Sequence, residues 1–273
     1  MAAGHTFLFF VNEVFMKYIS SRDNPLIKKL VKLKNKKYRD KENLFIVEGE
    51  KSVAEALQQK FLLRYLLLDA QWQQTDFMDK VPGVEYYQLA SGLIHDICDT
   101  ETPQGIAAVV QIPDYDFKNI TKEKLLILLD DVSDPGNVGT IIRSGWALGA
   151  DGILMTPGCA DPFSPKVVRA SMGGILHIPV YTNFPLETLH ALQSQGYLIY
   201  CSDVNSPNSL YDQDLTGGRV IVIGNESRGI SEKSKNLCDV KFKIPINSQA
   251  DSLNAAVACG IILAEASQQR SRS

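Results

Sequence analysis

One stretch, Leu125–Ala150 (LLILLDDVSDPGNVGTIIRSGWALGA), constrains the fold of this chain more than any other. It begins with an unbroken apolar run, which is typical of a strand covered on both faces. Asp134 can cap a helix whose first turn holds Pro135, where the missing N–H costs nothing. The pattern therefore predicts a buried strand, a turn and a helix. It places Asn137 and Arg143 near the end of the sheet where ligands of α/β proteins bind.

Strands and helices alternate along the rest of the second half, which predicts an α/β domain with a parallel sheet covered on both sides. The further expected strands are Gly152–Thr156, Leu176–Val180, Tyr197–Cys201, Val220–Ile223 and Lys241–Ile246. The further expected helices are Lys166–Met172, Leu186–Gln195 and Ser252–Ala266.

The first half predicts a smaller α/β domain over residues 16–113, followed by a polar linker over 114–123 and the larger domain over 124–270. The strands expected here are Leu44–Val47, Leu62–Leu68, Val84–Leu89 and Gly105–Ile112. The helices expected here are Leu26–Tyr38, a segment that follows Glu50 and ends at Lys60, Trp72–Lys80 and Ser91–Asp99. Residues 1–15 are expected to be a disordered extension. No basic segment precedes their Phe-rich run, which argues against a signal peptide.

Charge is distributed unevenly along the 273 residues, whose formal net charge is −3. The overall charge of the chain therefore gives no reason to expect that it binds a polyanion. The polar positions of the helix expected after Asn24 and Pro25 are nevertheless almost all basic, which favours contact with RNA phosphates over a merely solvated face. The candidate RNA-binding residues of this region are Arg22, Lys28, Lys29, Lys32 and Lys36.

The five cysteines form no CxxC pair. We therefore expect buried thiols in a reducing compartment, with neither a zinc site nor a disulfide framework. No apolar run approaches the length of a membrane-spanning helix.

Three polar loops follow expected strands of the second half: DPGNVGTIIR, IGNESRGI and INSQADSLNAA. A helix start with glycines favours an anion. A carboxylate in the same place, such as that of Glu226, would repel a phosphate and favours a ligand with a cationic part. Neither a P-loop nor a GxGxxG after a strand is present, which argues against an ordinary nucleotide-binding protein.

At these loops the sequence resembles the SpoU (TrmH-like) family of RNA 2′-O-methyltransferases, in the SPOUT class. DDVSDPGNVGTIIRSGWALGADGI, VIGNESRGIS and IPINSQADSLNAAVACGIILAEA resemble its three motifs in their order, and SPKVVRASMGGILHIPV resembles the segment between the first two. The first half, with NLFIVEGEKSVAEAL, resembles the L30e-type substrate-binding domain that precedes the catalytic domain in many members.

The resemblance implies a trefoil knot near the end of the catalytic domain and S-adenosylmethionine bound by the loops of that knot. The loops are Thr156–Gly158, Ile223–Gly229 and Ile244–Asn254. The cofactor-binding residues it implies are Thr156, Gly158, Gly224, Asn225, Gly229, Ile244, Ile246, Ser252 and Leu253. It also implies a cytoplasmic homodimer packed through the knot region, with RNA as partner, no membrane and no metal. Ribosomal RNA is favoured over tRNA by analogy with members that carry such a leading domain.

Arg143 matches the family arginine implicated in catalysis. Arginine is a poor general base because its pKa exceeds about 12. Our hypothesis is that Arg143 holds a phosphate of the target and stabilises the developing 2′-alkoxide. Asn137 would orient Arg143 or the ribose. Ser252 and Asn254 would position the target nucleotide or Arg143.

Each of these residues also has a structural interpretation. Arg143 could be an ordinary surface residue. Glu226 could shape the site, bind RNA or merely begin a helix, and Asn254 could cap one. Arg169 could contact RNA or be solvated.

The histidines His177 and His190 are expected to be packed or surface residues. An RNA-binding module of the same fold without turnover, and a tRNA methyltransferase, remain alternatives for the whole protein.

Overall fold

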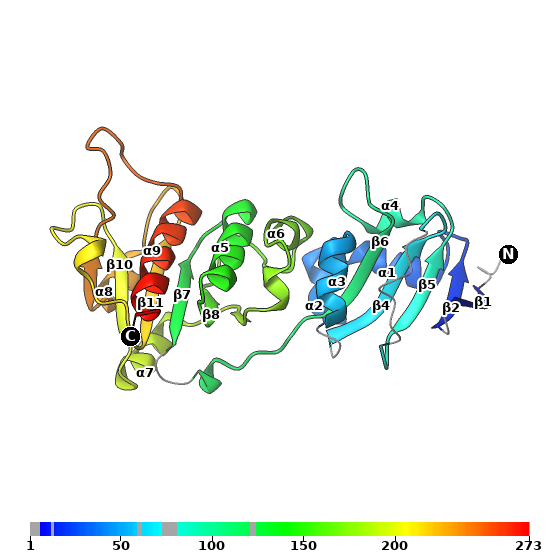
Figure 1. Ribbon diagram of the computed structural model, residues 1–273, viewed down its shortest axis with the longest axis horizontal. Coiled ribbons are helices and arrows are strands. Elements are labelled where there is room, and N and C mark those ends of the chain that lie inside the picture. The colour runs from blue at the N-terminus through cyan, green and yellow to red at the C-terminus, as the bar shows by residue number, and fades with distance from the viewer. Residues whose placement is uncertain (1–5, 12–13, 59–61, 73–80, 121–123, 273) are drawn as a thin grey trace. The chain divides into compact units, whose positions relative to one another are not determined.

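The computed structural model describes residues 6–11, 14–58, 62–72, 81–120 and 124–272. They form two compact units, which Figure 1 draws in blue to cyan and in green to red. The first comprises Met1–Pro113 with Phe163–Arg169, and the second comprises Asp114–Pro162 with Ala170–Ser273.

The first unit has a mixed six-stranded sheet in the order β1-β2-β5-β4-β6-β3. Neighbouring strands are parallel for β2/β5 and β5/β4 and antiparallel for the other three pairs. Its strands are β1 (Thr6–Val11), β2 (Val14–Ile19), β3 (Leu44–Glu48), β4 (Leu63–Asp69), β5 (Glu85–Leu89) and β6 (Ile106–Gln111). Its helices are α1 (Pro25–Lys32), α2 (Lys36–Glu42), α3 (Glu50–Gln58) and α4 (Leu93–Ile97).

The expectation of a disordered extension over residues 1–15 is wrong for β1 and for the beginning of β2. These strands pair in an antiparallel register from Thr6↔Ile19 to Val11↔Val14. The run Phe7–Val11 is rich in aromatic residues, and aromatic and β-branched side chains favour pleated strands. The expected helix Trp72–Lys80 lies, after its first residue, outside the described residues.

The single helix expected over Leu26–Tyr38 is two helices. Asn24 caps α1 as predicted, because its Oδ1 accepts from the Leu26 amide at 2.9 Å. The chain then turns, and the Oδ1 of Asn35 caps α2 by accepting from the Lys37 amide at 3.0 Å. The buried Arg39 guanidinium donates to the carbonyls of Leu33 at 2.7 Å and Lys34 at 2.8 Å. These bonds satisfy carbonyls left open at the end of α1.

The second unit has a six-stranded, all-parallel sheet in the order β12-β10-β11-β7-β8-β9. This confirms the α/β class and the parallel sheet. Its strands are β7 (Leu125–Asp130), β8 (Gly152–Met155), β9 (Val180–Tyr181), β10 (Leu198–Ser202), β11 (Arg219–Gly224) and β12 (Val240–Phe242). Its helices are α5 (Pro135–Ala147), α7 (Leu189–Ser194), α8 (Glu232–Leu237) and α9 (Ala255–Arg270), and α6 (Pro165–Ala170) runs across the boundary of the two units.

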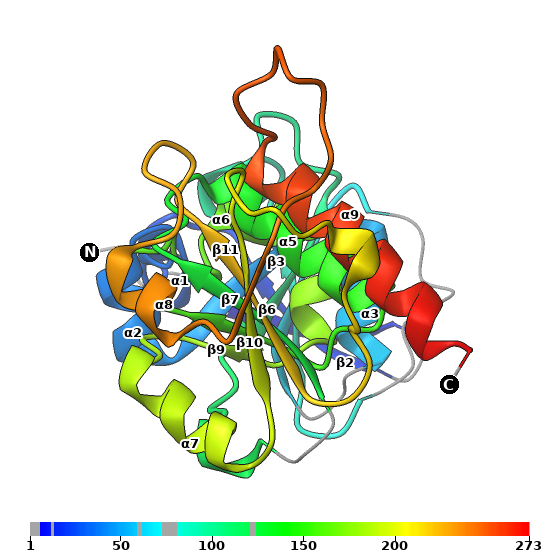
Figure 2. The same ribbon diagram turned by 90° about the vertical axis from the view of Figure 1, so that its left-hand side faces the viewer.

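Helices α5 and α9 cover one face of this sheet, and α7 and α8 lie on the other (Figure 2). Alternate residues of β7 point to opposite faces. Leu126 packs in the cluster with Leu189 of α7, whereas Ile127 faces α5. Gly145 brings α5 close to the sheet, since a Cβ there would lie 3.2 Å from Ile127 Cδ1.

The largest departure from the expected elements of this unit is at Leu176–Val180. That segment was expected to be a strand, but a 3-10 turn occupies Gly174–Leu176 and pairing begins only at Val180. In the described part of the chain, no helix has both the length and the apolar character needed to cross a membrane.

Candidate active site

The carboxyl ends of β7, β10 and β11 meet at one edge of the parallel sheet. Gly224 at the end of β11 pairs with Asp130 at the end of β7, and Cys201 of β10 pairs with Val222. The loops that follow these strands therefore begin side by side. This edge is where ligands of open α/β sheets bind.

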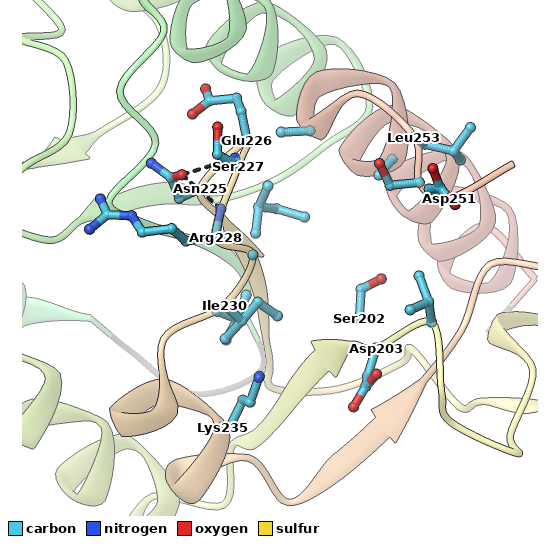
Figure 3. Close-up of a pocket in the computed structure, with 18 of the residues that line it drawn as sticks. Ser202, Asp203, Asn225, Glu226, Ser227, Arg228, Ile230, Lys235, Asp251 and Leu253 are labelled. Atoms are coloured by element: carbon cyan, nitrogen blue, oxygen red, sulfur yellow. Dashed lines mark hydrogen bonds between the residues drawn. The ribbon is translucent and has the colours of Figure 1, made fainter.

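The loop after β11 is a closed turn. The backbone amides of Asn225 and Gly229 each donate to the other's carbonyl, at 3.0 and 2.9 Å. The Asn225 Oδ1 accepts from the amides of Ser227 and Arg228 at 3.0 and 3.1 Å (Figure 3). Gly224 is required where the turn closes, because a Cβ there would overlap the backbone of Gly229. The loop thus presents backbone groups in a fixed arrangement.

Glu226 connects this loop to the start of α5. Its carboxylate accepts from the amides of Ser133 at 3.3 Å and Asp134 at 3.1 Å, and from Asn137 Nδ2 at 2.9 Å. Burial acts to raise the pKa of Glu226, but the hydrogen bonds from Asn137 and from backbone amides outweigh it and hold that pKa below its ordinary value. The carboxylate is therefore an ionised acceptor at the N-terminus of α5, where negative charge is favourable.

Asn137 also reaches the third loop. Its Oδ1 accepts from Asn254 Nδ2 at 2.9 Å. Asn254 in turn caps α9, because its Oδ1 accepts from the amides of Ala256 at 2.9 Å and Val257 at 3.2 Å. The capping interpretation of Asn254 is thus confirmed, together with a direct contact between motif residues. A chain of hydrogen bonds from Glu226 through Asn137 to Asn254 joins all three loops.

A cavity of about 380 Å³ lies beside this chain of hydrogen bonds, between the loops after β10 and β11 and the start of α9 (Figure 3). The predicted site residues that line it are Gly224, Asn225, Glu226, Gly229, Ser252 and Leu253. The loop after β10 supplies a wall that sequence reasoning missed: Ser202, Asp203, Val204 and Asn205. A polar segment directly after a buried strand was the available signal.

Four residues predicted to bind the cofactor do not line this cavity: Thr156, Gly158, Ile244 and Ile246. Thr156 follows β8, which β7 separates from β11 in the sheet. Its buried Oγ1 accepts from the Asp131 amide at 2.9 Å and supports the end of β7. Gly158 lies against the Asp131 carboxylate, where a Cβ would overlap an oxygen.

The sequence profile described as "SpoU rRNA Methylase family" matches residues 124–264. This chain belongs to that family. A second profile, "MRM3-like substrate binding domain", matches residues 24–108.

Relatives of this SpoU-family chain are similar over nearly its whole length. It is 32% identical over 248 residues to the 23S rRNA (guanosine(2553)-2′-O)-methyltransferase RlmP of Bacillus subtilis. The aligned region covers 91% of this chain and 98% of RlmP. Its fold is similar to a solved AdoMet-bound rRNA methyltransferase from Sinorhizobium meliloti, with TM-score 0.84, 29% identity and coverage of 93% and 98% of the two chains. It is also similar to the SpoU methyltransferase AviRb from Streptomyces viridochromogenes, with TM-score 0.81, 30% identity and coverage of 91% and 98%. The expected SPOUT-type fold is therefore confirmed, and the trefoil knot stays a prediction.

Arg143 of this SpoU-family site is exposed on α5, and within the described residues its side chain has no hydrogen bond or ion pair. The backbone of Gly174 packs closely against that of Arg143, since a Cβ at Gly174 would lie 3.2 Å from Arg143 Cα. The first turn of the same helix is fixed through Asn137 and Glu226. The guanidinium is therefore an available cation on a well-positioned helix.

The predicted RNA-binding cations are mostly ion-paired. In the first unit, Arg22 contacts Asp96 at 2.7 Å, Lys28 contacts Asp23 at 2.8 Å, Lys29 contacts Glu42 at 2.7 Å, Lys36 contacts Asp40 at 3.5 Å and Arg169 contacts Asp99 at 2.7 Å. Lys32 is different, because its Nζ lies 5.4 Å from the centre of the Tyr38 ring and no ion pair involves it in the described part of the chain.

The predictions for histidine and cysteine had mixed outcomes. His177 stacks on Trp146 with ring centres 4.3 Å apart, and His190 Nδ1 lies 3.2 Å from Gln193 Oε1. Both are packed or surface residues, as expected. Cys201 and Cys238 are paired, with Cα atoms 6.0 Å apart, which the expectation of separate thiols missed. Among the described residues, no three His, Cys, Asp or Glu side chains gather as a metal site requires.

Proposed function

We propose that this protein transfers a methyl group from S-adenosylmethionine to a ribose 2′-hydroxyl of RNA, with ribosomal RNA as the substrate class. The observation that carries the proposal is the chain of hydrogen bonds from Glu226 through Asn137 to Asn254. It fixes the helix that bears Arg143 to two loops of a ligand-sized cavity. The membership of the SpoU family and the similarity to RlmP and AviRb support the same reaction.

The lining of the cavity fits a methyl donor that carries both signs of charge. Asp203 and Asp251 supply carboxylates for the cationic part of the donor, and Lys235, whose ammonium also pairs with Glu232 at 2.8 Å, is a cation of the lining for its carboxylate. The volume lies in the range of about 300–1,000 Å³ that small-molecule sites occupy. The fixed turn after Gly224 offers backbone groups that can recognise adenine and ribose. When bound, S-adenosylmethionine supplies an electrophilic methyl group, so the chain itself must mainly align and bind.

Arg143 acts as a cation in this proposal. Its guanidinium holds a phosphate of the target strand and stabilises the negative charge that develops on the 2′-oxygen. A neighbouring phosphate or an ordered water accepts the proton, because arginine stays protonated. Asn137 is a positioning residue, since both ends of its amide are bonded to Glu226 and Asn254.

Two further expectations belong to this proposal. A homodimer is supported by exposed apolar side chains on α5 and α9, which pack against each other: Trp146 is 41% and Val257 is 51% exposed. A cytoplasmic location is supported by the ribosomal substrate named for RlmP. Of the basic residues expected to bind RNA, Lys32 is proposed to face it, because Arg22, Lys28, Lys29, Lys36 and Arg169 are each paired with a carboxylate.

The test is methyl transfer by the purified full chain. Labelled S-adenosylmethionine is incubated with ribosomal RNA and, separately, with tRNA, both from cells that lack the gene. We expect label in ribosomal RNA at one 2′-oxygen, absent from RNA of wild-type cells that already carries the mark. Label only in tRNA would contradict the substrate class, and RNA binding without any transfer would favour a binding module.

A further inference from the structure

Helix α1 lies between two hollows in the surface of the first unit. One, of about 440 Å³, opens toward α2 and is lined by Tyr38, Lys41 and others. The second, of about 580 Å³, opens toward α4 and is lined by Ile27, Val31 and others. Lys28 and Lys32 line both. A ridge of two lysines therefore separates two depressions in the surface.

The positive charge of this ridge is not evenly available. Lys28 is neutralised by Asp23 at 2.8 Å, and Lys29 by Glu42 at 2.7 Å. Across the second hollow, Arg22 is neutralised by Asp96 at 2.7 Å. In contrast, Lys32, Lys34 and Lys41 are exposed and take part in no ion pair among the residues that the structure describes. An anion is attracted to these three ammonium groups, because none of them is in an ion pair with a carboxylate, although Glu42 acts on Lys41 at longer range.

The hollows add surfaces of another kind. Tyr38 is half-buried, so its ring is partly accessible, and Lys32 Nζ lies 5.4 Å from the centre of that ring. The second hollow has a partly exposed aliphatic side chain, that of Val31, over the buried Ile27, and its lining includes Lys32 and Lys34. Aromatic and apolar surfaces beside cations suit unstacked bases with their phosphates. A duplex would present only its phosphates, since its bases are already stacked.

We propose that this surface, made of α1 and its two hollows, binds an unpaired segment of the RNA substrate. Phosphates bind Lys32, Lys34 and Lys41, and bases lie against Tyr38 in the first hollow and against Val31 in the second. Fewer of the lysines expected from the sequence to bind RNA are therefore involved, because the ion-paired Lys28, Lys29 and Lys36 contribute little to RNA binding. The inference rests on the proposed function, which makes RNA the ligand.

The experiment measures binding of the full chain to labelled oligouridylate, and to the duplex of that strand with oligoadenylate, by fluorescence anisotropy over a series of salt concentrations. The test variant is Lys32→Gln/Lys41→Gln, and the matched control is Lys17→Gln/Lys36→Gln, whose lysines line neither hollow. We expect the test variant to lose about tenfold in affinity for the single strand and to lower the salt slope by about 1.4, since each phosphate contact contributes about 0.7. The control should stay within about twofold of the wild type, because its lysines lie outside the two hollows and each already has a carboxylate partner, Glu85 for Lys17 and Asp40 for Lys36.

The apolar part is tested with Tyr38→Ala and Val31→Ser, which should weaken single-strand binding more than duplex binding. Equal losses of affinity in the two lysine variants would refute the assignment of RNA binding to the unpaired lysines. Tighter binding of the duplex than of the single strand would refute the claim that the bound RNA is unpaired. Thermal unfolding followed by circular dichroism shows for each variant whether the first unit, which carries the substitutions, remains folded. Oligonucleotide binding requires no turnover, so a protein that binds as expected but methylates no RNA would refute the proposed function alone.

Discussion

The side-chain amide of Asn137 donates to a carboxylate oxygen of Glu226 at 2.9 Å, across 89 positions of the sequence. Replacing Asn137 by Asp puts a second carboxylate against the first. Because like charges at this distance repel, we expect a lower melting temperature and at least about tenfold less methyl transfer. The matched control is Asn247→Asp, in an exposed segment where Oδ1 accepts from the Gln249 amide and an Asp oxygen can do the same. Equal effects of both substitutions would contradict the positioning role.

The acidity of Glu226 predicts how stability depends on pH. Its pKa is lower in the folded chain than its ordinary value of 4.5, because the hydrogen bonds to the carboxylate outweigh the effect of burial. The stabilisation is therefore fully present above pH 4.5 and is lost as the pH falls through the lower, folded-state value. Thermal unfolding of wild type and Glu226→Gln should differ most near neutral pH and converge in acid. A difference in stability between the two proteins that grows as the pH falls would contradict a lowered pKa of Glu226 in the folded chain.

A substitution of Arg143 is expected to affect methyl transfer without affecting donor binding. Arg143 is exposed on α5 and is absent from the lining of the cavity. We expect Arg143→Ala to lower the rate of methyl transfer by about 10²-fold or more, a typical loss for one group that stabilises developing charge. The dissociation constant for S-adenosylmethionine, measured by calorimetry, should change less than about twofold. Arg64→Ala, in the first unit, is the control, and a large loss of donor affinity in Arg143→Ala would refute the role.

Gly224 predicts a steric requirement at the cavity. A Cβ at this position would meet the backbone of Gly229 and Ile230, so Gly224→Ala must open the turn. We expect donor affinity to fall at least about tenfold, together with a loss of stability of about 1–3 kcal/mol. Gly260→Ala in α9 is the control, because a Cβ there meets nothing within 4 Å. In a helix interior it should be neutral or stabilising by about 0.5–1 kcal/mol. Normal donor binding by Gly224→Ala would show that the closed turn is dispensable.

Local chemistry explains which parts of the fold could be predicted. The boundary between β7 and α5 followed from an apolar run, a capping Asp134 and a first-turn Pro135, all within a few residues. The break between α1 and α2 could not be predicted in the same way. It depends on the buried Arg39, which reaches back to carbonyls five and six residues earlier.

Prediction of the site from the sequence was limited in the same way, because the site joins residues that lie far apart in the sequence. The loops of Asn137, Glu226 and Asn254 were expected to meet, and they do. The wall at Ser202–Asn205 was missed, because it depends on β10 lying next to β11 in the sheet. Thr156 was assigned to the cofactor site through the family resemblance, and the strand order places it after β8, two strands away from β11. Neighbouring strands are set by long-range topology, which no local pattern in the sequence reports.

The cap of α9 has a consequence for the newly made protein. Asn254 both starts that helix and bonds to Asn137, while Ala255 and Ala258 line the cavity. A nascent chain that ends before these residues lacks part of the lining of the cavity proposed to hold the methyl donor, however well its earlier strands have formed. Translation must therefore pass Ala258 and reach the first turns of α9 before the chain can bind its methyl donor.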